Sequence, residues 1–305
     1  MGHYLTELDL SATQTDALLT FAAALKAERA RGVLRTDLAG RSVALYFEKP
    51  SVRTRVSFTV GVRELGGDVV ELSGGTTKVG KGEHPEDFAR VLGRYAHAIV
   101  ARVFEQQMLE DLARAAGVPV VNALSDILHP CQALADALTI RERKGSIEGL
   151  RFVFVGEGNN VAASTGTLLC ALGAQVWVAS PRGYGLPDWV RKRCHGLPGE
   201  LHSVESVQGA VEGADVLYTD TWISMGREAE AEARRRIFAD FRIDSALLAA
   251  APDAIVMHCL PAVRGEEIDT DVMQSERSAI WDQAENRLHV QKALLLRLLA
   301  PSAVP

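Results

Sequence analysis

The chain has 305 residues, which is enough for two compact domains, because single hydrophobic cores usually stop growing at roughly 250 to 300 residues. Its composition, 47% hydrophobic and 24% charged, is typical of a folded globular protein. A formal net charge of −6 gives no overall positive field for a nucleic acid, and no apolar stretch reaches the roughly 18 residues of a membrane span. We therefore expect a cytoplasmic protein that binds neither nucleic acid nor membrane.

Short apolar runs rich in β-forming residues alternate with helix-like segments along the whole chain. Runs of this kind are typical of parallel strands that helices cover on both faces. Four runs precede residue 132 and four follow it, at residues 42–47, 68–72, 98–104, 118–124, 151–156, 174–180, 214–220 and 253–260. The pattern predicts an α/β fold with two lobes, each a parallel sheet covered by helices on both faces.

A helical stretch at residues 132–144, which ends at Gly145, is the natural place to divide the chain. We expect a first domain at residues 1–140 and a second at residues 141–283. The amphipathic C-terminal segment, residues 284–305, is expected to pack back on the first domain. This organisation predicts an active site in the cleft between the two lobes.

The end of the first apolar run has the features of an anion site. Pro50 breaks the strand, and Ser51 can cap a helix whose first turn contains Arg53 and Thr54. Free N–H groups and the helix dipole favour an anion at such a helix start. The alternative is a solvated helix start whose arginines form surface pairs. The pattern favours a phosphate or carboxylate site.

Two further strand ends offer polar side chains to the same place. Arg102 lies near the end of the third run, and the segment His129-Pro130-Cys131-Gln132 follows the fourth run and opens a helix. A lone histidine at a helix start is more often a packed or capping residue. In open α/β sheets, however, ligands bind beyond the carboxyl ends of the strands. We therefore expect Arg53, Arg102, His129 and Gln132 to form one site.

The fifth run leads into a glycine turn, Gly156-Glu157-Gly158, that resembles the start of a dinucleotide site. The third small residue of that fingerprint is absent, since Val161 occupies its position, and no acidic residue follows the next strand near Ser180. The sequence therefore predicts that no nicotinamide cofactor binds here. Asn159 and Asn160 still bring amide groups to the end of this strand.

The last two runs end in residues suited to an amino acid. Asp220 and Ser224 could bind an ammonium group while Asn160 binds a carboxylate, although Asp220 alone could equally be a helix cap. His258 and Cys259 are adjacent on an extended chain and point to opposite sides, so they do not form an activated thiol pair by themselves. The backbone carbonyls of Cys259 and Leu260 are better read as acceptors for a substrate NH2 group.

Five segments occur in an order and spacing that resemble a known family. SVRTR, HPCQ, GEGNNV, DTWISMG and HCLP are similar to the motifs of the aspartate/ornithine carbamoyltransferases, and the last two to its ornithine-type branch. The resemblance extends from about Leu8 to Leu299. It implies transfer of a carbamoyl group from carbamoyl phosphate to the side-chain amine of ornithine, giving citrulline for arginine biosynthesis. It also implies a homotrimer, or an assembly of trimers, that needs no metal and no organic cofactor.

The resemblance further implies the role of each site residue. Carbamoyl phosphate would contact Ser51, Val52, Arg53, Thr54, Lys78, Arg102, His129, Pro130, Cys131, Gln132, Cys259, Leu260 and Arg287. Ornithine would contact Asn160, Asp220, Ser224 and Met225, and the catalytic groups would be Arg53, Arg102, His129, Asp220 and Cys259.

Four positions depart from the commoner family pattern. Val52 stands for a threonine expected to act through its N–H group, and Lys78 stands for a glutamine that reaches a neighbouring subunit's site. Glu157 replaces an aspartate, and Val263 replaces a histidine. Two alternatives stay open: carbamoyl transfer to another amine, such as N-acetylornithine, lysine or putrescine, and a binding protein that has lost turnover.

Overall fold

The computed structural model describes residues 2–75, 77, 79, 82–223 and 228–304. The chain divides into two compact units. The first unit consists of Met1–Ala135 and Asn286–Pro305, and the second unit is Asp136–Glu285. Both boundaries fall inside continuous helices, α5 (Pro130–Lys144) and α12 (Ile280–Leu299).

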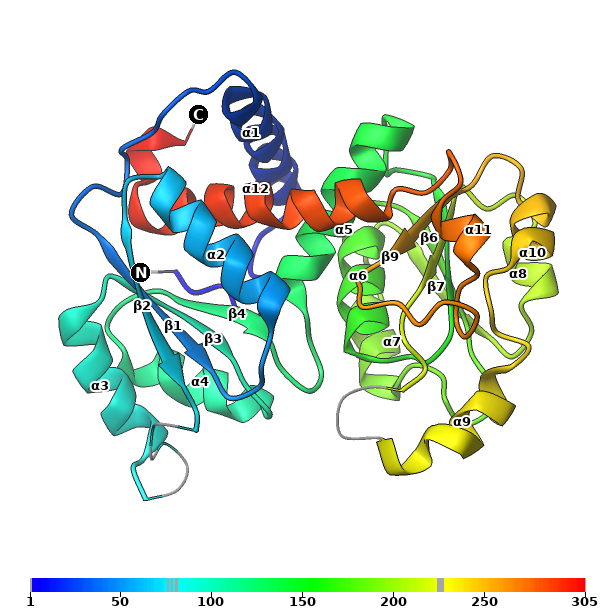
Figure 1. Ribbon diagram of the computed structural model, residues 1–305, viewed down its shortest axis with the longest axis horizontal. Coiled ribbons are helices and arrows are strands. Elements are labelled where there is room, and N and C mark those ends of the chain that lie inside the picture. The colour runs from blue at the N-terminus through cyan, green and yellow to red at the C-terminus, as the bar shows by residue number, and fades with distance from the viewer. Residues whose placement is uncertain (1, 76, 78, 80–81, 224–227, 305) are drawn as a thin grey trace. The chain divides into compact units, whose positions relative to one another are not determined.

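The first unit is built on a four-stranded parallel sheet with the order β2-β1-β3-β4 (Figure 1). Its strands are β1 (Ser42–Phe47), β2 (Asp68–Ser73), β3 (Ala98–Arg102) and β4 (Val120–Leu124). Its own helices are α1 (Ala12–Ala30), α2 (Val52–Glu64), α3 (Pro85–Tyr95) and α4 (Gln106–Ala115), with a short 3-10 turn, η2 (Pro301–Ala303), near the C-terminus. Strands β1, β3 and β4 are almost completely buried, as their continuous apolar sequences predicted.

Helices α3 and α4 lie together against one face of this sheet and form a core with it (Figure 1). Their buried residues, which include Leu92, Leu109 and Leu112, pack with Ile99 of β3. The two helices approach closely at Gly93, where an added Cβ atom would stand 1.7 Å from the carbonyl oxygen of Ala116. Only glycine fits at this contact.

The second unit is built on a five-stranded parallel sheet with the order β7-β6-β5-β8-β9. Its strands are β5 (Arg151–Val155), β6 (Gln175–Ala179), β7 (Glu200–Val204), β8 (Val216–Thr219) and β9 (Ile255–His258). Its own helices are α6 (Asn160–Ala171), α7 (Asp188–Cys194), α8 (Gln208–Val211), α9 (Ala231–Phe238), α10 (Ser245–Ala250) and α11 (Thr270–Met273), with η1 (Glu228–Glu230) before α9. Helices α6 and α7 lie on one face, and α8, α10 and α11 on the other (Figure 1).

The predicted α/β class, with two parallel sheets covered on both faces, is confirmed. The prediction of four strands in the second half was wrong, because β7 is a fifth. Its residues, ELHSV, are half-exposed or exposed at the sheet edge and form no continuous apolar run. An edge strand of this kind carries no burial signal in the sequence. No helix of the described residues has the length and apolarity needed to cross a membrane.

Candidate active site

The carboxyl ends of β1, β3 and β4 meet at one edge of the first sheet. In the strand register Phe47 pairs with Arg102, and Arg102 pairs with Leu124 after an irregularity in β3. Ser51, in extended conformation, caps α2, and its Oγ accepts a hydrogen bond from the backbone N–H of Thr54 at 3.4 Å. The predicted helix start after Pro50 is therefore confirmed at the end of β1.

A buried arginine from α12 joins the polar side chains at this edge. One guanidinium nitrogen of Arg287, Nη2, donates to Thr54 Oγ1 at 2.8 Å, and Nη1 donates to Gln132 Oε1 at 2.8 Å. The same Nη1 lies 3.5 Å from His129 Nε2. All four side chains are at least 95% buried. Residues 54, 129, 132 and 287, far apart in sequence, thus form one hydrogen-bonded group, which we call the arginine cluster.

His129 is held neutral in the arginine cluster. Burial lowers the pKa of its imidazole well below the usual 6.5, and the positive charges of Arg287 and Arg102 lower the pKa further. Since a guanidinium has only donors, His129 Nε2 can face Arg287 only as an acceptor, which places the ring proton on Nδ1. The cluster therefore combines strong cations with an uncharged imidazole, an arrangement suited to an anionic ligand.

Four further predicted residues of the first unit, Val52, Arg53, Pro130 and Cys131, lie close to cluster residues in the chain. Arg53 and Val52 are exposed at the start of α2, with Val52 at 77%. The side chain of Cys131 is turned inward, and its thiol donates to the Asn122 carbonyl at 3.3 Å. Burial raises the pKa of this thiol to about 12, so Cys131 is not a nucleophile at neutral pH. The carbonyl of Pro130 lies 3.5 Å from the Tyr4 hydroxyl, and Lys78 lies outside the described residues.

Lys49 is a residue that the sequence reasoning did not select. Burial lowers the pKa of its ammonium group, and the nearby Arg102 guanidinium lowers it further. Its Nζ also stands 4.7 Å from the centre of the Phe104 ring. Its position just after β1, two residues before Ser51, was the only signal in the sequence. Lys49 therefore adds a further cationic side chain near the carboxyl edge of the first sheet.

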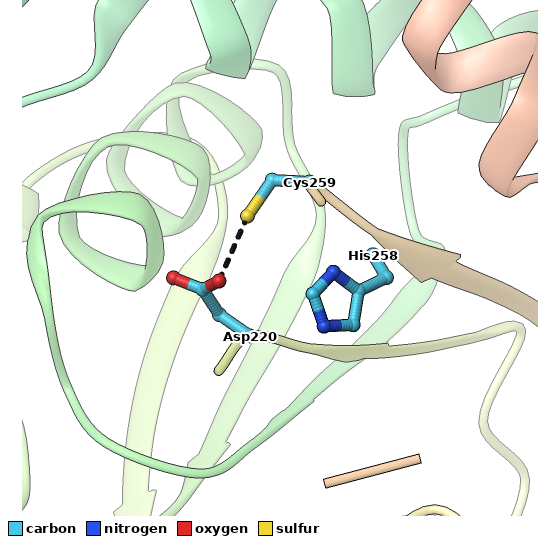
Figure 2. A group of neighbouring side chains, drawn as sticks. All are labelled: Asp220, His258 and Cys259. Carbon is cyan, nitrogen blue, oxygen red and sulfur yellow. Dashed lines mark hydrogen bonds between the residues drawn. The ribbon is translucent and has the colours of Figure 1, made fainter. Parts of the chain in front are cut away.

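In the second unit, three side chains form a chain of hydrogen bonds beyond β5, β8 and β9. Asn159 caps α6 by accepting from the N–H groups of Val161 and Ala162, and its amide donates to Asp220 Oδ2 at 2.8 Å. Asp220 Oδ1 accepts from the Cys259 thiol at 3.0 Å (Figure 2). We call Asn159, Asp220 and Cys259 the carboxylate cluster. The sequence predicted Asp220 and Cys259, but assigned Asn159 no specific role.

The turn before Asn159 requires glycine at two positions, Gly156 and Gly158. Gly156 has a φ angle of +138°, a backbone conformation that residues with a side chain rarely adopt. At Gly158 an added Cβ atom would stand 2.4 Å from the backbone nitrogen of Leu186. Asn160 is the first residue of α6. Glu157 pairs with the buried Arg234 of α9, so this carboxylate is tied to the protein and not turned toward a ligand. Ser224 and Met225 lie outside the described residues.

His258 and Cys259 are adjacent, but of the two only Cys259 is hydrogen-bonded to Asp220 (Figure 2). His258 Nδ1 accepts from the Leu260 N–H at 2.8 Å, and Nε2 lies 3.1 Å from the Glu267 carboxylate. Ligand atoms of Asp220, His258 and Cys259 lie within 4.8 Å of one another, close enough for a metal ion. Both ring nitrogens of His258 are already engaged, so metal binding would break one of these bonds. The contacts of the Cys259 and Leu260 carbonyls with a substrate NH2 group stay a prediction.

The fold and the two clusters define the class of a two-unit α/β protein with a buried cationic cluster in one unit and a carboxylate cluster in the other. A family model described as the aspartate/ornithine carbamoyltransferase carbamoyl-P binding domain matches residues 2–142. A second model, described as the Asp/Orn binding domain of the same family, matches residues 148–298. The chain belongs to the aspartate/ornithine carbamoyltransferase family.

Individual relatives agree with this membership. The chain is 53% identical to an ornithine carbamoyltransferase of Acidothermus cellulolyticus over 302 residues, covering 97% of this chain and 96% of the relative. The structure is similar to that of ornithine carbamoyltransferase from Pyrococcus furiosus, with TM-score 0.95 and 46% identity over 97% of this chain and 96% of the other. It is also similar to the Gloeobacter violaceus ornithine carbamoyltransferase, with TM-score 0.88 and 43% identity over 98% and 99% of the two chains.

Proposed function

We propose that this chain transfers the carbamoyl group of carbamoyl phosphate to the δ-amine of L-ornithine, giving L-citrulline and phosphate. In this proposal the first unit binds carbamoyl phosphate and the second unit binds ornithine. The uncharged amine attacks the carbonyl carbon, forms the new C–N bond, and the tetrahedral intermediate expels phosphate. No metal or organic cofactor takes part.

The carboxylate cluster is the observation that carries the choice of acceptor. An acceptor that is itself an acid, such as aspartate, needs cations around its side-chain carboxylate. The carboxylate cluster instead presents the Asp220 carboxylate, the Cys259 thiol and the Asn159 amide. A carboxylate and a thiol suit an amine or ammonium group. The names of the relatives point to the same acceptor.

The arginine cluster supports the donor half of the proposal. Arg287 and Arg102 supply fixed positive charge for a phosphate, and the Thr54 hydroxyl lies in the first turn of α2, whose N-terminus favours an anion. Thr54, Arg102 and His129 are the proposed donors to the oxyanion that develops on the carbonyl oxygen. Because His129 is neutral, it can donate a hydrogen bond without adding a further charge. Removing one such donor typically costs about 100- to 1,000-fold in rate.

The proposal extends to the location, the pathway and the oligomeric state of the enzyme. We propose a cytoplasmic enzyme of arginine biosynthesis that assembles as a homotrimer or as a group of trimers. A relative from Pyrococcus furiosus, 51% identical over 264 residues, is named an anabolic ornithine carbamoyltransferase, which supports the biosynthetic direction. Lys78 stays the proposed counterpart of the glutamine that relatives place in a neighbouring subunit's site.

The test is a rate assay with purified protein, carbamoyl phosphate and a panel of acceptors: ornithine, N-acetylornithine, lysine, putrescine and aspartate. Selective turnover of ornithine supports both substrates. Turnover of another amine would retain the donor site and reject the acceptor assignment at Asp220 and Asn160. Absence of turnover with every acceptor would favour a binding role and reject the proposal.

A further inference from the structure

A buried polar network lies near the carboxylate cluster, close enough that the charges of Asp220 and Cys259 act on Tyr218. The side-chain amide of Gln283, on α12, donates through Nε2 to Asp136 Oδ1 at 2.7 Å and to the Tyr218 hydroxyl at 2.9 Å. Its Oε1 accepts from the backbone N–H of His258 at 2.9 Å. Thr165 Oγ1 donates to the other oxygen of Asp136 at 2.6 Å. We call Asp136, Thr165, Tyr218 and Gln283 the buried network.

The residues of the buried network belong to, or bond to, the three elements that precede or carry the proposed acceptor-binding residues: β8, β9 and α6. Tyr218 is two residues before Asp220, and His258 is the residue before Cys259. In the register of β8 and β9, Thr219 pairs with His258, so Asp220 and Cys259 leave neighbouring strands side by side. Thr165 belongs to α6, which begins at Asn160. One carboxylate, Asp136, thus ties together the elements that carry the amine-binding and carboxylate-binding residues.

The donors and acceptors of the network allow only one orientation of Gln283. Both oxygens of Asp136 accept hydrogen bonds from side-chain donors. A carboxylate must be met by the NH2 end of the amide, so the carbonyl end points to the His258 N–H. If Gln283 were flipped, oxygen would face oxygen at Asp136 and nitrogen would face nitrogen at His258. The carboxylate therefore selects the orientation in which Gln283 holds the end of β9.

The burial of these groups makes the arrangement rigid. Asp136, Thr165, Tyr218 and Gln283 have no exposed surface, and His258 is 1% exposed. Burial raises the pKa of the Tyr218 phenol far above 10, and the negative charge of Asp136 raises it further, so the phenol stays protonated. Polar groups this deep cost free energy unless they are hydrogen-bonded, and a fully bonded buried network resists displacement. If these residues only filled space, apolar side chains would do so at a lower free-energy cost of burial.

We propose that Asp136 and Gln283 are positioning residues for the acceptor site, which hold Asp220 and Cys259 at the separation that binds and orients the substrate amine. Neither residue touches substrate. The inference rests on the proposed function, since it assigns these residues to the acceptor half of that reaction. It predicts that disturbing the network changes the kinetics for the acceptor and leaves the kinetics for carbamoyl phosphate unchanged.

The experiment measures KM for both substrates and kcat on the full chain, together with the thermal unfolding midpoint. Gln283→Leu and Asp136→Leu are each expected to raise the ornithine KM by about tenfold, because each removes several buried hydrogen bonds that hold the ends of β8 and β9. The KM for carbamoyl phosphate should stay within about twofold of the unmodified value. The double variant Asp136→Asn with Gln283→Glu exchanges amide and carboxylate, keeps an acceptor for the His258 N–H, and should restore the ornithine KM.

A matched pair in α6 separates positioning from general destabilisation. Thr165→Val removes the hydroxyl that donates to Asp136, whereas Thr167→Val removes an equally buried hydroxyl that faces Cys194 instead. Both variants should lower the unfolding midpoint, but only Thr165→Val should raise the ornithine KM. This mild pair keeps the test decisive if a leucine variant fails to fold.

Three outcomes would overturn the inference: an unchanged ornithine KM in Gln283→Leu, an exchanged double variant no better than that single variant, or equal kinetic effects of Thr165→Val and Thr167→Val. If the unmodified chain carbamoylates a different amine, the same measurements are made with that amine. In that case the acceptor assignment fails while the positioning role is still tested. Absence of turnover with every amine would overturn both.

Discussion

The two clusters differ in charge and in exposure. The arginine cluster is cationic and at least 95% buried, with Arg287 bonded to Thr54 and Gln132 and with a neutral His129. The carboxylate cluster is anionic and only partly buried, since Asp220 and Cys259 keep intermediate exposure. A buried cationic site suits a small anion that must be held and polarised, whereas a more open carboxylate suits an amine that must exchange a proton with solvent. Under the proposed function, each unit therefore carries the electrostatics suited to one of the two substrates.

The largest expected effect is a loss of activity on removing either of two arginines of the proposed carbamoyl phosphate site, which differ in their effect on stability. Arg287→Ala and Arg53→Ala should each lower kcat/KM by about 1,000-fold, because each removes fixed positive charge from the phosphate. Only Arg287→Ala should also lower the thermal unfolding midpoint, since Thr54 and Gln132 lose a buried partner, whereas Arg53 is exposed. Arg297→Ala, farther along α12, serves as the control for both measurements. Near-normal activity of Arg53→Ala would show that the anion site is assigned wrongly.

The next effect tests the acceptor half. Asp220→Asn should raise the ornithine KM by roughly 30-fold or more, because it removes the charge that faces the substrate amine. The KM for carbamoyl phosphate should be little changed. Asp215→Asn is the matched control, since Asp215 lies just before the opposite end of β8 and accepts from the Arg151 backbone N–H at 2.9 Å. A rise in ornithine KM for Asp215→Asn as large as that for Asp220→Asn would mean that the effect is a loss of folding.

The pH dependence of the rate tests whether the amine bound at the carboxylate cluster must lose a proton before it attacks. The attacking amine must be uncharged, and a free alkylammonium has a pKa of about 10, so kcat/KM for ornithine should rise with pH up to about 8 or above. At low pH the expected slope is about tenfold per pH unit, because one proton must leave. Steady-state rates from pH 6 to pH 9 measure it. A flat profile over this range would rule out attack by a deprotonated amine as the pH-sensitive step.

The smallest effect concerns stability. Because burial and two arginines lower the pKa of folded His129, the unfolded chain binds a proton there first as the pH falls below about 6.5. The contribution of neutral His129 to the free energy of unfolding is therefore fully present above pH 6.5, and it declines as the pH falls toward the pKa of His129 in the folded chain. His129→Asn should reduce this decline, as measured by urea unfolding at pH 5, 6, 7 and 8. Identical pH dependence in both proteins would contradict the neutral His129.

Much of the fold was predictable because most of the apolar runs report burial on both faces of a sheet; β2 is the exception, an edge strand with no buried residue. The eight predicted runs became strands, although Arg102 ends β3 where the run to Phe104 had suggested a longer strand. β7 was missed, since an edge strand with Glu200, His202 and Ser203 has no such run. The cap at Ser51 was predictable from Pro50 and the residues that follow, because capping depends on local chemistry.

The candidate site was predictable only in part. Residues at strand ends, such as Arg102 and Asp220, were found because parallel strands direct their carboxyl ends to one edge. Lys49 and Asn159 were not assigned a role, because their importance depends on neighbours from other elements. The sequence did not indicate that the Cys131 thiol is turned toward the Asn122 carbonyl, and the predicted contact of Cys131 with carbamoyl phosphate stays a prediction. The direction of a side chain depends on packing that local sequence does not specify.

The sequence by itself determined the α/β class, the strand ends that carry chemistry and the family resemblance, because periodicity and motif spacing are local properties of the chain. Only the tertiary structure decided the contacts of Arg287 with Thr54 and Gln132, and of Gln283 with Asp136 and His258. Polar residues on a helix look like a solvated face until the fold shows that the face is buried. Hydrogen bonds between residues on different elements, three of these four between residues more than a hundred positions apart, exist only after the elements have packed.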